Sequence, residues 1–196
     1  MGEGECNFLL TMGKNKVFFI FLIIVGGISL GVFCFFKDGG YRNFLKNEDC
    51  FTIEELTVNG YSMYPLIEPE ERVDGLFGYY NCHEINRNDI VIFNYSGNKN
   101  MIIKSVKAIP GDKWSIEEID GYYQIFVNDS PLKNSEGNDY KLSEASSRVL
   151  KIYINDYPII PKDAYLLLGD EIGGSLDSTR FGLAGKLDIK AKVIIK

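Results

Sequence analysis

The stretch "VNGYSMYP" (residues 58–65) places Ser62 two residues after Gly60 and three before Pro65. A serine hydroxyl can attack a carbonyl carbon once a neighbouring base takes its proton, so Ser62 is a candidate nucleophile. Gly, Ser and Pro at this spacing are also common in turns, where a serine side chain only caps the backbone. The stretch alone leaves both interpretations open, and a nucleophilic role requires a base nearby.

Lys104, in "MIIKSVKAI" (101–109), is the candidate base. In a strand it shares a face with Ile102 and Val106 and interrupts their apolar pattern. Burial can lower the pKa of a lysine from about 10.4 by up to about 3–5 units, and the neutral amine can then accept the serine proton. The alternative is that the Lys104 side chain extends from a half-buried strand into solvent.

Other kinds of chemistry find little support. His83 is the only histidine and lies in a polar, loop-like run, so we assign it no role and exclude a zinc site with two histidines. We expect no metal and no cofactor. The run "LLLGDEIGGSLDSTRFG" (166–182) combines a strand with a Gly-rich turn. Its Asp and Ser side chains can bond the nearby backbone, and a phosphate loop is not indicated because no Gly-Lys-Ser/Thr follows.

The elements that must position these side chains are mainly strands. Beyond residue 50 the chain shows alternating or short apolar runs between turn-rich segments, which predicts a mainly β domain with a barrel-like or bent antiparallel sheet. The polar run 134–147 is predicted to be an exposed loop, and residues 141–149 to form one helical turn or two. The predicted strands are 72–80, 89–95, 101–109, 113–119, 122–127, 148–154, 164–170 and 186–195.

Residues 17–36 contain no charged side chain, and Lys16 and Lys37 flank them. Twenty helical residues cover about 30 Å, the hydrocarbon thickness of a bilayer, so we predict a retained transmembrane helix. It follows a short segment, 1–16, and tethers a β-rich domain, 37–196. Lysine and arginine lie on both sides of the span, so charge does not fix its orientation.

The net charge of −6 argues against nucleic acid as a partner. Of the four cysteines, Cys6, Cys34, Cys50 and Cys82, the last two share the large domain, and no pair has a CxxC spacing. A disulfide between Cys50 and Cys82 is possible if the domain is exported, but we expect two free thiols.

Taken in order after an apolar N-terminal segment, these stretches resemble the bacterial type I signal peptidases, membrane-anchored serine endopeptidases that cleave signal peptides from exported proteins. "GYSMYP" is similar to the family's GxSMxP box, and "IIKSVKAIPGD" to its lysine box. "LLLGDEIGGSLDSTRFG" is similar to its GDN…NSxDSRxxG box. The resemblance runs from about residue 16 to residue 196.

The resemblance implies a role for each of these residues. Ser62 would be the nucleophile and Lys104 the general base of a Ser–Lys dyad. Ser175 would hydrogen-bond the lysine amine, and Asp177 would belong to a supporting polar network. Gly60 stands where some members have a serine that helps to bind the oxyanion, so the Ser62 N–H would do more of that work.

The same resemblance implies signal peptides and the lipid bilayer as partners. It also implies a single-pass protein of the plasma membrane with an extracytoplasmic catalytic domain. A substrate-facing or membrane-facing stretch is then expected at Met63, Tyr64, Pro65 and Leu66, and it extends to 76–80 if those side chains are exposed. The alternative is that these apolar side chains fill the core.

The chain departs from the family pattern and would be a divergent member. Ser105 follows the lysine where arginine is usual, and Thr179 stands where the last box has arginine. The salt bridge of Asp177 with that arginine is therefore put in doubt. The alternative to an enzyme is a catalytically silent, membrane-anchored β-domain that binds exported peptides or a partner. The presence of both Ser62 and Lys104 favours the enzyme.

Overall fold

The computed structural model describes residues 50–95 and 101–196. The predicted segment 1–16 and the predicted transmembrane helix 17–36 lie outside the described residues. Within the described ranges, no helix has the length and apolar character needed to cross a membrane.

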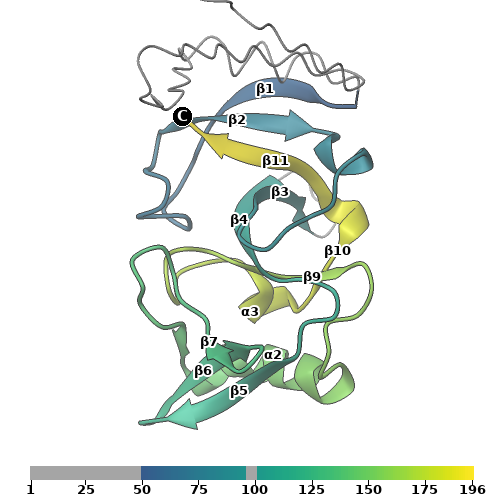
Figure 1. Ribbon diagram of the computed structural model, residues 1–196. Helices are drawn as coiled ribbons and strands as arrows, with labels where there is room; N and C mark the ends of the chain where they lie inside the picture. Colours follow the sequence, from purple (N-terminus) through teal and green to yellow (C-terminus); the bar gives the residue numbers. More distant parts are fainter. Residues whose placement is uncertain (1–49, 96–100) are drawn as a thin grey trace, which may run out of the picture. The chain divides into compact units, whose positions relative to one another are not determined.

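A seven-stranded antiparallel sheet forms the larger part of this region (Figure 1). Its strands run in the order β1-β2-β11-β3-β4-β9-β10, and β1 and β10 are its two edges in the described part of the chain. The predicted antiparallel sheet is therefore confirmed, but the barrel-like alternative is wrong because neither sheet closes. The strands are β1 Thr52–Thr57, β2 Arg72–Phe77, β3 Ile90–Asn94, β4 Met101–Ala108, β9 Ala164–Leu168, β10 Ala184–Gly185 and β11 Ile189–Ile195.

Strand β4 is central because it pairs with β3 on one side and β9 on the other. Its last five residues, 104–108, are all buried, although Lys104, Ser105 and Lys107 are polar. Two apolar clusters pack on the strands around it, one with Val106 and Leu167 and the other with Met63 and Ile92. Polar side chains at such positions cost free energy unless they find partners, so they are candidates for function.

A smaller sheet lies at the other end of the region, where β5, β6 and β7 appear beside α2 in Figure 1. A third cluster of buried side chains includes Trp114 and Ile125 of this smaller sheet and Leu166 of β9. These elements are β5 Trp114–Ile119, β6 Tyr122–Val127, β7 Ser130–Pro131, β8 Lys141–Leu142 and α2 Glu144–Asp156. Short helices complete the region: η1 Tyr79–Asn81, α3 Ser178–Phe181 and η3 Lys186–Asp188.

Helix α2 corrects two predictions, the strand over 148–154 and the exposed loop that was expected to reach residue 147. The run "RVLKIYI" alternates like a strand, but Ser143 begins a helix by accepting a hydrogen bond from the Ser146 N–H at 3.2 Å. The buried side chains of Ser147 and Leu150, three residues apart, then lie on the face that packs against the smaller sheet.

Cys50 and Cys82 form a disulfide, so the prediction of two free thiols is wrong. Strand β1, which the sequence pattern did not predict, explains the pairing. It lies antiparallel to β2 with Thr52 opposite Phe77, which brings Cys50 to the segment that follows β2. Helix η1 lies in that segment, and Cys82 follows it as its C-cap.

Candidate active site

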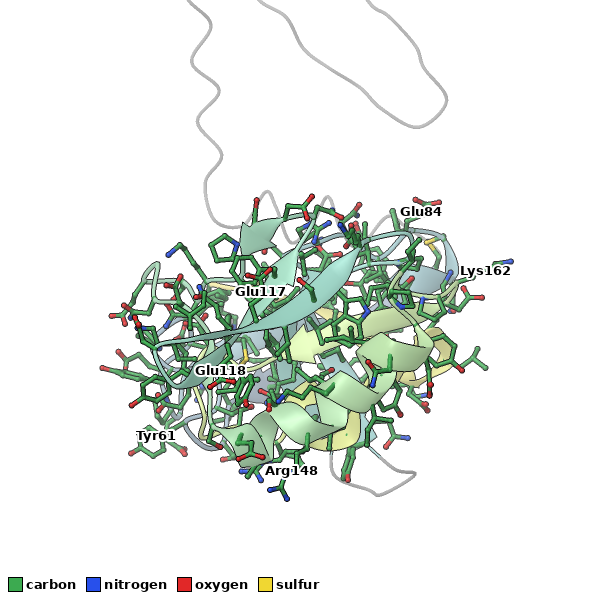
Figure 2. All side chains as sticks on the ribbon, turned by 90° about the horizontal axis from the view of Figure 1, so that it is seen from below. Tyr61, Glu84, Glu117, Glu118, Arg148 and Lys162 are labelled. Atoms are coloured by element: carbon green, nitrogen blue, oxygen red, sulfur yellow. A yellow bond between two sulfur atoms is a disulfide. The ribbon has the colours of Figure 1, made fainter. Side chains whose placement is uncertain are left out.

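Ser62 lies in the turn that follows β1. The Tyr61 carbonyl accepts a hydrogen bond from the Tyr64 N–H, and the Met63 carbonyl accepts one from the Ile67 N–H, both at 2.9 Å. Met63 and Ile67 are buried in the core. Tyr61, in contrast, is 68% exposed and projects from the ribbon in Figure 2. The turn is thus anchored on both sides of Ser62, and the hydroxyl has a defined position.

Lys104 brings its amine to this hydroxyl. The Lys104 Nζ lies 2.7 Å from the Ser62 Oγ, and it donates a hydrogen bond to the Ile103 carbonyl at 2.6 Å. The residue is only 1% exposed. Burial lowers the pKa of Lys104 to about 8, although the negative charge of Asp177 acts in the opposite direction. A buried amine that is partly neutral near pH 7 and touches a serine hydroxyl can act as a general base.

Strand β9 pairs with only part of β4. Strand β9 pairs with β4 only from Ser105, opposite Leu168, onward. Strand β3 pairs with β4 as far as Met101. Within the described strands, residues 101–104 therefore have an unpaired edge on the β9 side. An extended peptide can pair with such an edge.

Gly169, just beyond β9, is packed tightly against the nucleophile. A Cβ atom at this position would lie 2.3 Å from the Ser175 Oγ and 2.5 Å from the Ser62 carbonyl oxygen. The next residue but one, Glu171, donates its N–H to that same Ser62 oxygen at 3.3 Å. The third sequence cluster, 166–182, thus meets the Ser62 turn directly.

Ser175 is placed beside these residues but is not bonded to Lys104. It is 6% exposed, and its Oγ has no hydrogen-bond partner among the described residues. Since a buried hydroxyl without a partner costs free energy, this atom is poised to accept or donate a hydrogen bond that the structure does not contain.

Asp177 is held without the arginine that the resemblance would supply. Its Oδ2 accepts a hydrogen bond from the Gly169 N–H at 3.0 Å. Its Oδ1 accepts from the Thr179 N–H at 3.0 Å and the Thr179 hydroxyl at 2.7 Å, so Asp177 caps helix α3. Thr179, to which sequence reasoning gave no role, therefore donates two hydrogen bonds to the Asp177 carboxylate at the position where the family pattern has an arginine.

The remaining predicted residues occupy different environments. Gly60 is exposed with a φ of 90°, a left-handed conformation that disfavours serine although a side chain would have space. Met63 is 1% exposed, whereas Tyr64 is exposed and Pro65 and Leu66 are half-buried. Within residues 76–80, the predicted extension of this stretch, Leu76 and Tyr80 are buried in the core. Leu76 and Tyr80 therefore fill the core, and the buried Met63 side chain cannot contact lipid directly.

A cavity of about 220 Å³ opens beside Ser62. It lies between the end of β1 with the residues that follow, 56–59, and the start of β4, 101–103. Its walls are largely apolar and include Leu56, Val58, Met63, Ile92, Met101 and Ile103. The cavity thus offers a small, largely apolar space next to the Ser62 hydroxyl.

Within the part of the chain that the structure describes, one group of three side chains has the composition of a metal site: Cys50, Cys82 and His83. Its two sulfur atoms are joined in the disulfide and are not available as thiolate ligands. The His83 ring stacks on Tyr79 with ring centroids 4.0 Å apart. The arrangement is a disulfide with an aromatic neighbour.

Comparisons with known proteins identify the family of the chain. The model of the family described as "Signal peptidase, peptidase S26" matches residues 49–196. The chain is similar to signal peptidase IB of Staphylococcus aureus (strain COL), with 30% identity over 148 residues, 73% of this chain and 76% of that protein. It is also similar to signal peptidase I P of Bacillus subtilis subsp. natto, with 31% identity over 143 residues, 71% of this chain and 74% of that protein.

Among solved structures, a signal peptidase I from Enterococcus faecalis V583 aligns with a TM-score of 0.41 and 19% identity. The alignment covers 57% of this chain and 98% of that one. The assignment of the family rests on the sequence matches alone.

Proposed function

Because the chain belongs to the signal peptidase family, peptidase S26, and is a serine endopeptidase, we propose that it cleaves signal peptides by a Ser62–Lys104 dyad. The observation that carries this proposal is the 2.7 Å contact between the Lys104 Nζ and the Ser62 Oγ, together with the burial of that amine. A surface lysine would be charged at pH 7 and could not accept a proton.

The chemistry follows from this contact. Neutral Lys104 accepts the Ser62 proton while Oγ bonds to the scissile carbonyl carbon, and backbone N–H groups near Ser62 stabilise the oxyanion. The ammonium of Lys104 then gives a proton to the departing amine, which leaves an ester on Ser62. Lys104 next takes a proton from a water whose oxygen attacks the ester carbonyl, and its ammonium then returns a proton to the Ser62 Oγ as the bond between the acyl carbon and Oγ breaks. The residues present supply every proton transfer.

Ser175 and Asp177 would orient the base. A neutral amine has two N–H donors and one lone pair. One donor points to the Ile103 carbonyl, and the Ser175 Oγ, which has no partner among the described residues, would accept the other, so that the lone pair faces Ser62. Asp177 stabilises the lysine ammonium that forms during attack, because its charge favours the protonated amine.

The substrate would bind as an extended strand. The unpaired β4 edge at 101–104 offers backbone hydrogen bonds. The apolar cavity beside Ser62 offers space for small residues before the cut, such as those at the end of a signal peptide.

We place the catalytic domain, 37–196, on the extracytoplasmic side of the plasma membrane. The segment 1–16 would precede a single transmembrane helix over 17–36. The apolar run 17–36 supports the anchor. The disulfide between Cys50 and Cys82 supports the side, since disulfides persist in oxidising compartments and are rare in the cytosol. Partners would be the bilayer and the signal peptides of exported proteins.

The test is co-expression of a reporter preprotein with the wild-type chain, with Ser62→Ala and with Ser130→Ala. Ser130 is an exposed serine outside the site and serves as the matched control. We expect the processed band with the wild type and the control but not with Ser62→Ala, at equal levels of membrane-bound protein. Processing by Ser62→Ala at the wild-type rate would remove Ser62 from the mechanism and favour the silent binding domain.

A further inference from the structure

A second cavity, of about 280 Å³, lies beyond the Ser62 turn. Its wall includes Ile90 of β3 with Ser105 and Lys107 of β4, whereas the apolar cavity beside Ser62 includes Ile92 and Ile103. Ile90 pairs with Ser105 and Ile92 with Ile103, so these four side chains share one face of the sheet. Along the sequence of β4, residues 101–103 line the apolar cavity and Ser105 and Lys107 line the second cavity, with Lys104 between them.

The second cavity also adjoins the nucleophile through the chain. Leu66, four residues after Ser62, forms part of its wall, and so does Asp170. Asp170 follows Gly169, the residue that packs against the Ser62 carbonyl. Both cavities thus adjoin the Ser62 turn: Ser62 itself lines the apolar cavity, and Leu66 and Asp170 line the second one.

The lining of the second cavity is polar, unlike that of the first. Asp170 is fully buried, and its two oxygens accept hydrogen bonds from the N–H of Ser135, at 2.9 Å, and from the Ser135 hydroxyl, at 2.5 Å. The Lys133 amine is bonded to Asp139 at 2.6 Å. Both Asp170 oxygens thus already have donors, and the Lys133 amine already has a carboxylate, so neither group is free to bind a ligand strongly.

Lys107 differs from them. It is 8% exposed, and its amine donates to the Lys133 carbonyl at 3.0 Å, the one acceptor within hydrogen-bond distance among the described residues. An ammonium has three donors, so two remain for a group that enters the cavity. Burial lowers the pKa of Lys107, and the charge of Asp170 opposes this. A buried amine with spare donors is stabilised by an oxygen acceptor.

The geometry points to a subsite for the mature side of the substrate, in which Lys107 binds an acidic side chain shortly after the scissile bond. The inference rests on the proposed function. Lys107 is three residues beyond Lys104, which corresponds to about 10 Å along a strand, so the side chain would belong to one of the first three residues after the cut. The volume is below the range of about 300–1,000 Å³ typical of sites for drug-sized ligands, which suits one side chain.

The test uses the purified full chain in detergent and peptides that span a cleavage site. At each of the first three positions after the cut, otherwise identical peptides carry Glu, Gln or Lys. The enzymes are wild type, Lys107→Met, Lys107→Gln and, as a control, Lys113→Met, which removes an exposed lysine outside the cavity. The measured quantity is the ratio of kcat/KM for the Glu peptide to that for the Lys peptide.

At one of the three positions we expect the wild type and Lys113→Met to favour Glu over Lys at least tenfold, and both Lys107 variants to lose at least four fifths of that ratio. A wild-type ratio below two at all three positions would refute the subsite, whether or not the Lys107 variants fold. The subsite would also be refuted if folded Lys107→Gln showed the same Glu-to-Lys ratio of kcat/KM as the wild type.

A Ser62→Ala arm separates this inference from the proposed function. If the wild type cleaves all peptides equally and Ser62→Ala cleaves none, the proposed function stands and the subsite is refuted. If Ser62→Ala cleaves as the wild type does, the proposed function fails, and the inference fails with it.

Discussion

The dependence of activity on pH follows from the burial of Lys104. With a pKa of about 8, the amine is neutral in about a tenth of the molecules at pH 7, in about a hundredth at pH 6 and in most of them at pH 9. If the neutral amine is the base, kcat/KM rises about 90-fold from pH 6 to pH 9 and then levels off. A lysine with a pKa of 10.5 would instead give a tenfold rise per pH unit to beyond pH 9.

The assay is the initial rate of cleavage of a peptide that spans a cleavage site, by the full chain in detergent, from pH 5 to pH 10. Asp177→Asn should move the midpoint to lower pH, because the Asp177 charge raises the pKa of Lys104. Asp129→Asn, which changes an exposed carboxylate, should leave it in place. An optimum below pH 6 with loss of activity at pH 8 would refute the reasoning, since it would indicate a carboxylate base.

Three further predictions concern stability and packing. Relative to Lys104→Met, the wild type should gain about 3 kcal/mol in its free energy of unfolding from pH 7 to pH 10.5, measured by denaturant titration at both pH values. The pKa of Lys104 is about 8 in the folded state and 10.5 in the unfolded state, so the destabilisation caused by burying the charged amine is complete below pH 8 and is lost as the pH rises to 10.5. A difference between the two proteins that does not change with pH would contradict the lowered pKa of Lys104. The double variant Cys50→Ser, Cys82→Ser should have a free energy of unfolding about 3–4 kcal/mol lower than the wild type, since the disulfide closes a separation of 32 residues. Reduced wild type should melt at the same temperature as the double variant. If oxidised wild type also melts at that temperature, the disulfide does not stabilise the fold. Gly169→Ala should reduce kcat/KM at least tenfold because its Cβ would collide with Ser175 and Ser62. The control Gly185→Ala should leave kcat/KM unchanged because a Cβ has space there. Equal rates for the two variants would show that the Ser62 turn can shift freely.

Much of the β structure could be predicted because local pattern and burial agree. In β4 the face that carries Ile102 and Val106 is otherwise apolar, and Lys104 stands out because it occupies a position on that face that should be apolar. The same anomaly identified the candidate base. One observation thus predicts both the strand and the site, since a polar residue at a buried position is both an exception to the strand pattern and a candidate for function.

The misses have physical causes. Strand β1 lies at the edge of its sheet with mostly exposed side chains, so its apolar signal is weak, and without it the closeness of Cys50 and Cys82 could not be foreseen. In α2 the run after Ser143 alternates like a strand, but the capping hydrogen bond and the packing of Leu150 favour a helix.

Contacts between distant segments are the other kind of miss. Ser135 meets Asp170 across 35 residues of sequence, from a run that is typical of an exposed loop. Thr179 satisfies Asp177 in place of an arginine, although the spacing alone suggested only a lost salt bridge. Such pairs depend on how the elements pack, which the sequence pattern does not encode locally.

The most direct test of the Ser62–Lys104 dyad compares Lys104→Met with the wild type and Lys113→Met in cleavage of the same peptide at pH 8. Methionine keeps the length and apolar character of the side chain but cannot accept a proton. Since a positioned general base contributes about 10²–10⁴-fold, we expect kcat/KM to fall at least 100-fold in Lys104→Met and to stay within twofold in Lys113→Met. If folded Lys104→Met keeps more than a tenth of the wild-type activity, Lys104 is not the base that activates Ser62.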